Sequence, residues 1–323
     1  MILTDYFRST PDLTWEIGRQ CGIRHGTIRL PETPDFDLTD KSHWMTVYKR
    51  FTDYGIRPVV VEPMPNCVHD HIKTGDSMRD ESIDQVIRML PIMEALDIRT
   101  ICFNFMAHIG WLRTCQTIPE RGGALVTGFR QQDFRPTDKA ITTEELWKNY
   151  TYFIKAVVPE AEKHGIRLAL HPDDPPLEHL GSVSRILVSA ENIRRAINGI
   201  LPSPCLGLTM CQATFYMMGE DLFQIIPEFR EQIFFIHFRN AVGNKYDFRE
   251  TFHDNGALDM PALMELYHRC GIHVPIRVDH VPTLTFEQSR QAGYDALGRL
   301  YAIGYLKGIL ETVERRDRVP GVS

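Results

Sequence analysis

The sequence lacks several features that mark secreted, membrane and nucleic-acid-binding proteins. Its seven cysteines include no CxxC pair and do not form a disulfide framework. No apolar run approaches the roughly 18 residues that a membrane-spanning helix needs. Residues 1–12 do not join a charged segment to an apolar one, which argues against a signal peptide. The net charge is −6 and no basic cluster stands out. We therefore expect a reduced, cytoplasmic protein that binds neither membranes nor nucleic acid.

What the sequence does contain is a regular alternation of short apolar runs and amphipathic stretches. Several runs are continuous in Val, Ile, Leu or Phe, which is typical of parallel strands covered on both faces. The runs fall at residues 1–7, 27–30, 57–63, 99–105, 167–171, 206–211, 233–238 and 275–280. The stretches between them have the spacing of helices with one apolar face. They include residues 80–96, 141–165 and 259–271.

The helix expected over residues 141–165 has the most complete end signals. Thr142 and Glu145 are spaced as a capping box, and Ile141 and Leu146 flank them as a hydrophobic staple. A glycine at the far end of the stretch stops the helix. End signals of this kind show where a helix begins and ends, and so separate the predicted helices from the predicted strands. Eight strands alternating with helices predict a (β/α)8 TIM barrel that forms a single domain over residues 1–323.

One connection is too long for a simple turn between a strand and a helix. Residues 106–141 are rich in Gly, Pro, Arg and Asp. Connections of this length in a compact domain are usually functional. We expect a long active-site loop that acts as a lid over the barrel mouth, with a disordered surface insertion as the alternative.

Four successive strands end in residues that bind metals. The last four predicted strands end at His171, at Cys211, at His237 and at Asp279. The carboxyl ends of barrel strands meet at one face, so these four side chains are expected to converge there. Any one of them alone would be read as a structural residue, but four in register indicate a metal site. By residue type alone, two imidazoles, a thiolate and a carboxylate suggest zinc.

Other polar and aromatic residues follow the same strand ends. Arginines are good partners for a carboxylate because a guanidinium binds it through two hydrogen bonds. Aspartates after a metal-binding strand can hold a ligand's partner or a sugar hydroxyl, although capping a turn is an equal alternative. The residues that we expect to contact substrate are Asn104, Trp111, Arg113, Asp173, Arg239, Asn240 and His253.

Short motifs spread over nearly the whole chain resemble the mannonate dehydratase family. The motifs occur along the chain in the same order as in the family. Three of them, "HPDDPP", "HFRN" and "ET.H..G..DM", are each specific to the family. The motifs are "HIKTGDSMRD" (71–80), "CFNFM…WLRT" (102–114), "HPDDPP" (171–176), "LTMCQ" (208–212), "IHFRN" (236–240), "ETFHDNGALDM" (250–260), "RVDH" (277–280) and "GYDALGRL" (293–300).

The resemblance implies a xylose-isomerase-like barrel that dehydrates D-mannonate to 2-keto-3-deoxy-D-gluconate. It places the metal ligands at the same four strand-end residues and implies Mn2+ or Fe2+ in preference to zinc. His280 and Tyr294 match its acid/base pair. We follow the resemblance on the metal, because ligand type alone predicts the metal poorly. We also expect a small-molecule sugar acid as substrate and a homodimer.

The sequence departs from the family's pattern near the expected substrate site. Ala107 and His108 replace the usual residues after "NFM", and Gly110 precedes the tryptophan. Leu177 follows "HPDDPP", and Val281-Pro282 follows the final ligand strand. These departures concern the identity of the substrate more than the metal. Two alternatives therefore stay open, namely a metal-dependent sugar isomerase, epimerase or other lyase, and a non-catalytic barrel with a structural metal.

Overall fold

The computed structural model describes residues 1–288 and 292–316, and its centre is a closed barrel of eight parallel strands. Around the barrel the strands pair in the order β1-β14-β11-β10-β7-β4-β3-β2, and β14 pairs with β1 to close the ring. The barrel strands are β1 (Ile2–Arg8), β2 (His25–Arg29), β3 (Arg57–Val61), β4 (Thr100–Phe103), β7 (Arg167–Leu170), β10 (Leu206–Cys211), β11 (Ile233–Phe238) and β14 (Pro275–Val278). The predicted TIM barrel and all eight of its strands are confirmed.

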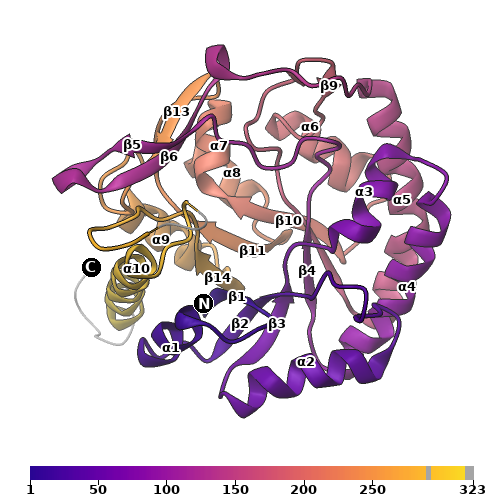
Figure 1. Cartoon of the computed structure of the whole chain (residues 1–323), viewed down its shortest axis with the longest axis horizontal. Helices are drawn as coiled ribbons and strands as arrows, with labels where there is room; N and C mark the ends of the chain where they lie inside the picture. Colours follow the sequence, from indigo (N-terminus) through magenta and orange to yellow (C-terminus); the bar gives the residue numbers. More distant parts are fainter. Residues whose placement is uncertain (289–291, 317–323) are drawn as a thin grey trace.

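Helices surround the barrel as an outer layer (Figure 1). Within the described residues they are α1 (Leu13–Gln20), α2 (Lys41–Asp53), α3 (Asn66–Thr74), α4 (Arg79–Ala95), α5 (Thr143–His164), α6 (Ala190–Arg194), α7 (Gln212–Met218), α8 (Leu222–Glu228), α9 (Met260–Arg269) and α10 (Ala296–Arg316). Short helical turns are η1 (Arg121–Gly123), η2 (Gln131–Asp133) and η3 (Arg195–Gly199). The apolar faces of the α-helices pack on the outer face of the strands and form the main core. No described helix is both long and apolar enough to cross a membrane.

The expected end signals of α5 are present. Glu145 donates its backbone N–H to Thr142 Oγ1 at 3.2 Å, and the Glu145 carboxylate accepts from the Thr142 N–H at 2.8 Å. Ile141 and Leu146 are both buried beside this cap. Gly165 ends the helix with φ of 61°, a left-handed conformation that costs glycine little. The capping box predicted from sequence is therefore confirmed.

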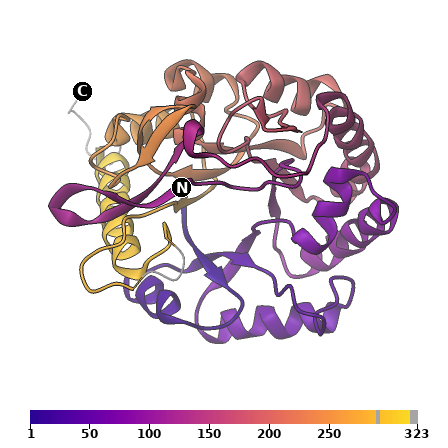
Figure 2. The ribbon, with the colours of Figure 1, turned by 45° about the horizontal axis from the view of Figure 1, so that its top comes forward.

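A second, antiparallel sheet is built from connections at the carboxyl ends of the barrel strands. Its order is β12-β13-β6-β5, formed by β5 (Cys115–Pro119), β6 (Leu125–Arg130), β12 (Ala241–Asn244) and β13 (Asp247–Glu250). A small hairpin joins β8 (His179–Leu180) to β9 (Val183–Ser184). In both ribbon views the β5–β6 hairpin projects from the body of the barrel (Figures 1 and 2). The sheet therefore lies beside the barrel mouth.

The connection over residues 106–141 is thus not a plain loop. It contributes β5 and β6 to the small sheet, and Leu125 exchanges backbone hydrogen bonds with Thr283 beyond β14. The alternative of a disordered insertion is wrong, because β6 pairs with β13 and fixes the segment to the connection after β11. A role for the segment as a lid stays a prediction.

Several predicted strands extend past the observed ones by one or two residues. The strands β3, β4, β7 and β14 stop at the residue just before a polar side chain. The polar residues that follow them are Glu62, Asn104, His171, Asp279 and His280. Because the strands end there, these side chains leave the barrel wall and reach the mouth.

Candidate active site

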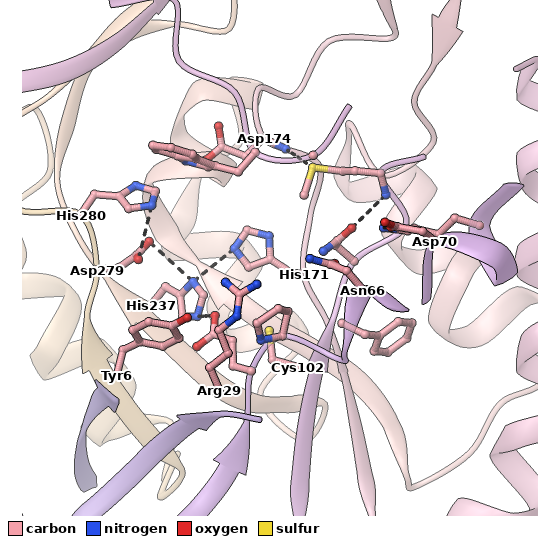
Figure 3. A pocket seen from close by; sticks show the side chains of 18 of the residues that line it. Tyr6, Arg29, Asn66, Asp70, Cys102, His171, Asp174, His237, Asp279 and His280 are labelled. Carbon is pink, nitrogen blue, oxygen red and sulfur yellow. Dashed lines mark hydrogen bonds and ion pairs between the residues drawn. The ribbon is translucent and has the colours of Figure 1, made fainter. Parts of the chain in front are cut away.

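A cavity of about 590 Å3 opens at the carboxyl ends of the barrel strands. Its wall includes His171, His237, Asp279 and His280, which Figure 3 shows grouped on one side. Three of the four predicted metal-binding side chains therefore line the cavity. The fourth, Cys211, is fully buried behind them.

The two histidines face each other through one nitrogen of each ring. His171 Nε2 and His237 Nδ1 lie 3.2 Å apart. The other nitrogen of each ring faces an oxygen, because His171 Nδ1 lies 2.6 Å from the Pro172 carbonyl and His237 Nε2 lies 2.9 Å from Glu62 Oε1. Partners of this kind place the ring proton on the outer nitrogen and leave the inner nitrogen free to bind a metal. The arrangement presents two imidazole lone pairs to one point.

A thiol and a carboxylate complete the group of donors. One donor atom each from His171, Cys211 and His237 lies within 4.8 Å of the others. Asp279 Oδ2 lies 3.7 Å from His237 Nδ1. Burial by itself raises the pKa of Cys211, but Arg239 and hydrogen bonds from the two histidines outweigh it and hold that pKa well below the usual value. The thiol is therefore ready to bind as a thiolate.

The buried groups around these donors carry an excess of negative charge. They form one connected set of ion pairs and hydrogen bonds, made of Arg113, Arg239, Arg277, Glu62, Asp174, Glu250, Asp279 and Cys211. Burial raises the pKa of the four carboxyl groups, but neighbouring cationic groups outweigh it and keep all four pKa values low. Burial and Arg277 lower the pKa of His237, but Glu62, Asp279 and Cys211 outweigh them and raise that pKa to about 9 in the absence of a metal. Metal binding requires neutral imidazoles. Four carboxylates and one thiolate then face three guanidinium groups, which leaves two excess negative charges. One divalent cation would balance them, so these residues fit a divalent metal.

His280 is held beside the donor group by contacts at both ring nitrogens. Its Nδ1 lies 2.5 Å from Glu250 Oε1, and its Nε2 lies 3.1 Å from the Tyr294 hydroxyl. Burial raises the pKa of Glu250, but His280 and two arginines outweigh it and lower that pKa to about 2. The ionised carboxylate therefore accepts the Nδ1 proton, and Nε2 is left as a base. Trp111 covers the ring, with 4.8 Å between ring centroids.

The backbone at His280 is unusual as well. Its φ is 26°, in a region that residues other than glycine seldom occupy. Strained residues of this kind gather at functional sites, where the surrounding structure holds them in place. Burial raises the pKa of Tyr294 well above its usual value, with a further contribution from the charge of Asp279. Tyr294 therefore keeps its proton beside the free nitrogen of His280.

Two arginines expected at the substrate are instead part of the supporting ion pairs. Arg113 binds Asp174 through both terminal nitrogens at 2.7 and 3.0 Å and also contacts Glu250. Arg239 contacts the same two carboxylates and lies 3.1 Å from Asp279 Oδ2. Both guanidinium groups are fully buried and lie outside the cavity wall. The protein's own carboxylates already occupy both arginines, and a contact of either with substrate stays a prediction.

Three further residues expected at the substrate also hold the surrounding chain. Asp173 accepts the backbone N–H groups of residues 186 and 187 at 3.0 and 2.9 Å, and Asn240 bonds the backbone of Leu258. Burial lowers the pKa of His253 to about 4, and its Nε2 donates to the Phe238 carbonyl at 2.8 Å. Contacts of these three residues with substrate stay a prediction. Of the seven predicted substrate residues, the described cavity wall includes Asn104 and Trp111.

Four residues outside the predicted set of site residues also shape the site. Glu62 and Arg277 bind each other at 2.8 and 2.9 Å and support His237 and Asp279. Glu250 and Asp174 link the buried arginines to the site, and Asp174 also lines the cavity. A signal for Glu62 was present, because it follows a predicted strand as the metal-binding residues do. The carboxylate of Glu62 follows the third strand of the barrel.

The fold and this cluster define a class of protein, a TIM barrel with a metal-binding site at the mouth of the barrel. Comparison with known proteins makes the class specific. The family model for D-mannonate dehydratase (UxuA) matches residues 6–140 and 134–319. A mannonate dehydratase of Streptococcus agalactiae serotype Ia is 32% identical over 341 residues, which cover 95% of this chain and 97% of the relative. The chain belongs to the D-mannonate dehydratase family.

Solved structures agree with that assignment. The crystal structure of mannonate dehydratase from Streptococcus suis serotype 2 superposes with a TM-score of 0.89 at 26% identity and covers 100% of this chain and 96% of that one. A structure of L-ribulose 3-epimerase superposes with a TM-score of 0.62 at 14% identity, with 98% of each chain covered. The second likeness concerns the fold alone. Membership of the family favours dehydration over the isomerase, epimerase and structural-metal alternatives.

Proposed function

We propose that this protein is a metal-dependent hydro-lyase that converts D-mannonate to 2-keto-3-deoxy-D-gluconate and water. The observation that carries the proposal is the position of His280. Its Nδ1 is tied to an ionised carboxylate and its Nε2 faces a tyrosine hydroxyl, at the cavity wall beside four metal-binding side chains. A base beside a site for a divalent cation is what removal of a proton next to a carboxylate requires.

His171, Cys211, His237 and Asp279 would hold the metal. When bound, a divalent ion supplies positive charge that stabilises the negative charge developing on the substrate's carboxylate. Glu62 orients His237, and the Pro172 carbonyl orients His171, so each ring presents the correct nitrogen. We propose Mn2+ or Fe2+, as the resemblance implies, with Zn2+ as the alternative that the thiolate favours.

His280 and Tyr294 divide the proton transfers. His280 Nε2 takes the proton from C2, and the electron pair of that C–H bond forms the C2–C3 double bond while the C3–O bond breaks. Tyr294 keeps its proton because burial raises its pKa, so it can protonate the departing C3 hydroxyl as water. The 3.1 Å contact between the two groups allows the proton to return from the imidazole to the tyrosine oxygen. The enol product then becomes the 2-keto acid.

The surrounding residues support this chemistry. The Trp111 ring lies beside His280 at an interplanar angle of 50° and lines the cavity, where it limits the access of water to the base. Asn104 lines the same cavity and offers its amide to a substrate hydroxyl. The seven cysteines are free thiols, which agrees with the proposed cytoplasmic location. The expected dimer stays a prediction.

The test is turnover by purified protein loaded with Mn2+ and offered D-mannonate, other aldonates and keto-sugars. We expect a 2-keto-3-deoxy acid from D-mannonate, identified by mass spectrometry as the loss of one water. An isomer of unchanged mass from a keto-sugar, with no reaction of any aldonate, would instead support an isomerase or epimerase. Bound metal without turnover of any compound would support a structural metal.

A further inference from the structure

The substrate of the proposed reaction is an anion, and the described cavity wall contains three side chains with a permanent cationic group. These are Arg29, Lys73 and Arg277. Arg277 is occupied, because it binds Glu62 through two nitrogens and contacts Asp279 at 2.8 Å. The exposed fraction of its side chain is 3%. It is therefore part of the buried scaffold.

Lys73 is also held by the protein. Its Nζ lies 2.7 Å from Asp70 Oδ1, and the exposed fraction of the lysine side chain is 4%. Burial lowers the pKa of Lys73, and the neighbouring Asp70 acts in the opposite direction. The lysine and aspartate together present a neutral pair to the cavity.

Arg29 differs from the other two. It is the last residue of β2 at the barrel mouth, and the exposed fraction of its side chain is 37%. Its ion pair with Glu32 uses Nε and Nη2, which both donate to one carboxylate oxygen at 3.1 and 2.6 Å, and Tyr6 is a second hydrogen-bonding neighbour. The ion pair uses two of the five N–H donors of the guanidinium, so donors remain for a ligand beside Tyr6. Figure 3 shows Arg29 beside Tyr6 among the side chains that line the cavity.

We propose that Arg29 binds the carboxylate of the sugar acid and is a specificity residue of the reaction. The inference rests on the proposed function, because it takes a sugar acid as the ligand. A planar guanidinium binds a carboxylate through two parallel hydrogen bonds, and the geometry selects an acid over its uncharged analogues. A cation at this place also opposes the negative charge that grows when C2 loses its proton.

The rest of the cavity suits the uncharged part of the substrate. Tyr6 neighbours both Arg29, with which it forms a hydrogen bond, and Tyr294, whose ring centroid is 5.8 Å from its own. Asn66 and Thr74, from α3, also line the cavity and offer groups that bind hydroxyls. In Figure 3, Asn66 lies on the side away from His280. An acid whose carboxylate is at Arg29 can therefore extend its hydroxyls toward α3.

The experiment compares Arg29→Gln and Arg29→Lys with the wild type. For Arg29→Gln we expect KM for D-mannonate to rise at least tenfold while kcat changes less, and Arg29→Lys should recover part of the loss. Calorimetric binding of D-mannonate and of its uncharged amide to the Mn2+-loaded protein gives a second readout. The wild type should prefer the acid, and Arg29→Gln should lose that preference. Metal content should be the same in all of these proteins.

Two further variants sharpen the test. Glu32→Gln releases the guanidinium from its protein partner, and we expect binding of D-mannonate at least as tight as in the wild type. Arg24→Gln removes an exposed arginine just before the opposite end of the same strand and should change neither KM nor the preference for the acid. An unchanged KM and an unchanged preference in Arg29→Gln would overturn the inference. Failure of the proposed function is a different result, namely no keto acid from the wild type, and calorimetry still tests Arg29 in that case.

Discussion

The imidazole of His280 and the carboxylate of Glu250 meet at 2.5 Å, and the exposed fraction of each side chain is 4%. Glu250 comes from β13 of the small antiparallel sheet, while His280 follows the last barrel strand. The same carboxylate contacts Arg113 and Arg239. The orientation of the proposed base therefore depends on a sheet outside the barrel.

Glu250→Gln should lower kcat by a factor of about 100 or more, the usual contribution of an oriented acid or base. The amide keeps the shape of the side chain but no longer requires a proton on Nδ1 of His280, so the free nitrogen loses its fixed direction. Steady-state kinetics with D-mannonate measures the effect, and metal analysis should show an unchanged metal content. Glu178→Gln, on an exposed ion pair with Lys245, is the matched control. Wild-type kcat in Glu250→Gln would remove this carboxylate from the mechanism.

Tyr294→Phe should keep its metal and lose most of its turnover. The hydroxyl lies 3.1 Å from His280 Nε2, and the substitution removes the only group of this side chain that carries a proton to donate. We expect kcat to fall by a factor of about 100 with little change in the binding of D-mannonate. Product formation measured over time gives kcat, and calorimetry gives the affinity for D-mannonate. Turnover at the wild-type rate would exclude Tyr294 as the acid.

His171→Ala should lose both bound metal and activity. The substitution removes one of two imidazoles whose free nitrogens lie 3.2 Å apart. Chelation of the wild-type protein should have the same effect and also lower Tm, because the excess negative charge then stays unbalanced. Added Mn2+ should restore the chelated wild type but not the variant. His179→Ala, at an exposed position on β8, is the control, and full activity in a metal-free protein would contradict the metal mechanism.

His69 should make the stability of the protein depend on pH. It is fully buried, both ring nitrogens lack a hydrogen-bond partner among the described residues, and it packs against Phe103, Phe105 and Phe153. Burial, helped by the charge of Lys73, lowers its pKa well below 6.5. The unfolded chain therefore binds a proton near pH 6.5 that the folded chain does not bind.

This difference fixes the sign of the effect. The contribution of His69 is lost as pH falls below about 6.5, and the free energy of unfolding then decreases by up to about 1.4 kcal/mol per pH unit. His69→Leu should remove this part of the slope in urea unfolding measured between pH 7 and 5. His273→Leu, at an exposed position, is the control. An equal slope in His69→Leu and wild type would show that the histidine is not kept neutral in the folded protein.

The barrel and the side chains at its strand ends were predictable because each rests on a local pattern. The apolar runs match strands buried on both faces, and the residue after each run is placed at the mouth by the fold itself. The capping box at Thr142 and Glu145 was equally local. None of these predictions needed knowledge of which distant segments meet.

The buried ion pairs could not be predicted, for the opposite reason. Arg113 and Asp174 are 61 residues apart, and Arg113 and Glu250 are 137 apart, so no local pattern reveals that they bind each other. When these partners are not known, an arginine near a strand end is expected to be available to substrate. The availability of Arg29 to a ligand also depends on the tertiary structure, because it differs from the other arginines only in its partners and in its partly exposed side chain.

The sequence by itself determined the eight strands, the helices between them and the four donors at the strand ends, because spacing and side-chain type fix local structure. It also determined the family, since the motifs are specific and ordered. Only the tertiary structure decided which charged groups neutralise one another, which nitrogen of each histidine is free, and that the small sheet supports the base. Those properties depend on pairs of residues far apart in the chain, and burial makes the pairing of such charges obligatory.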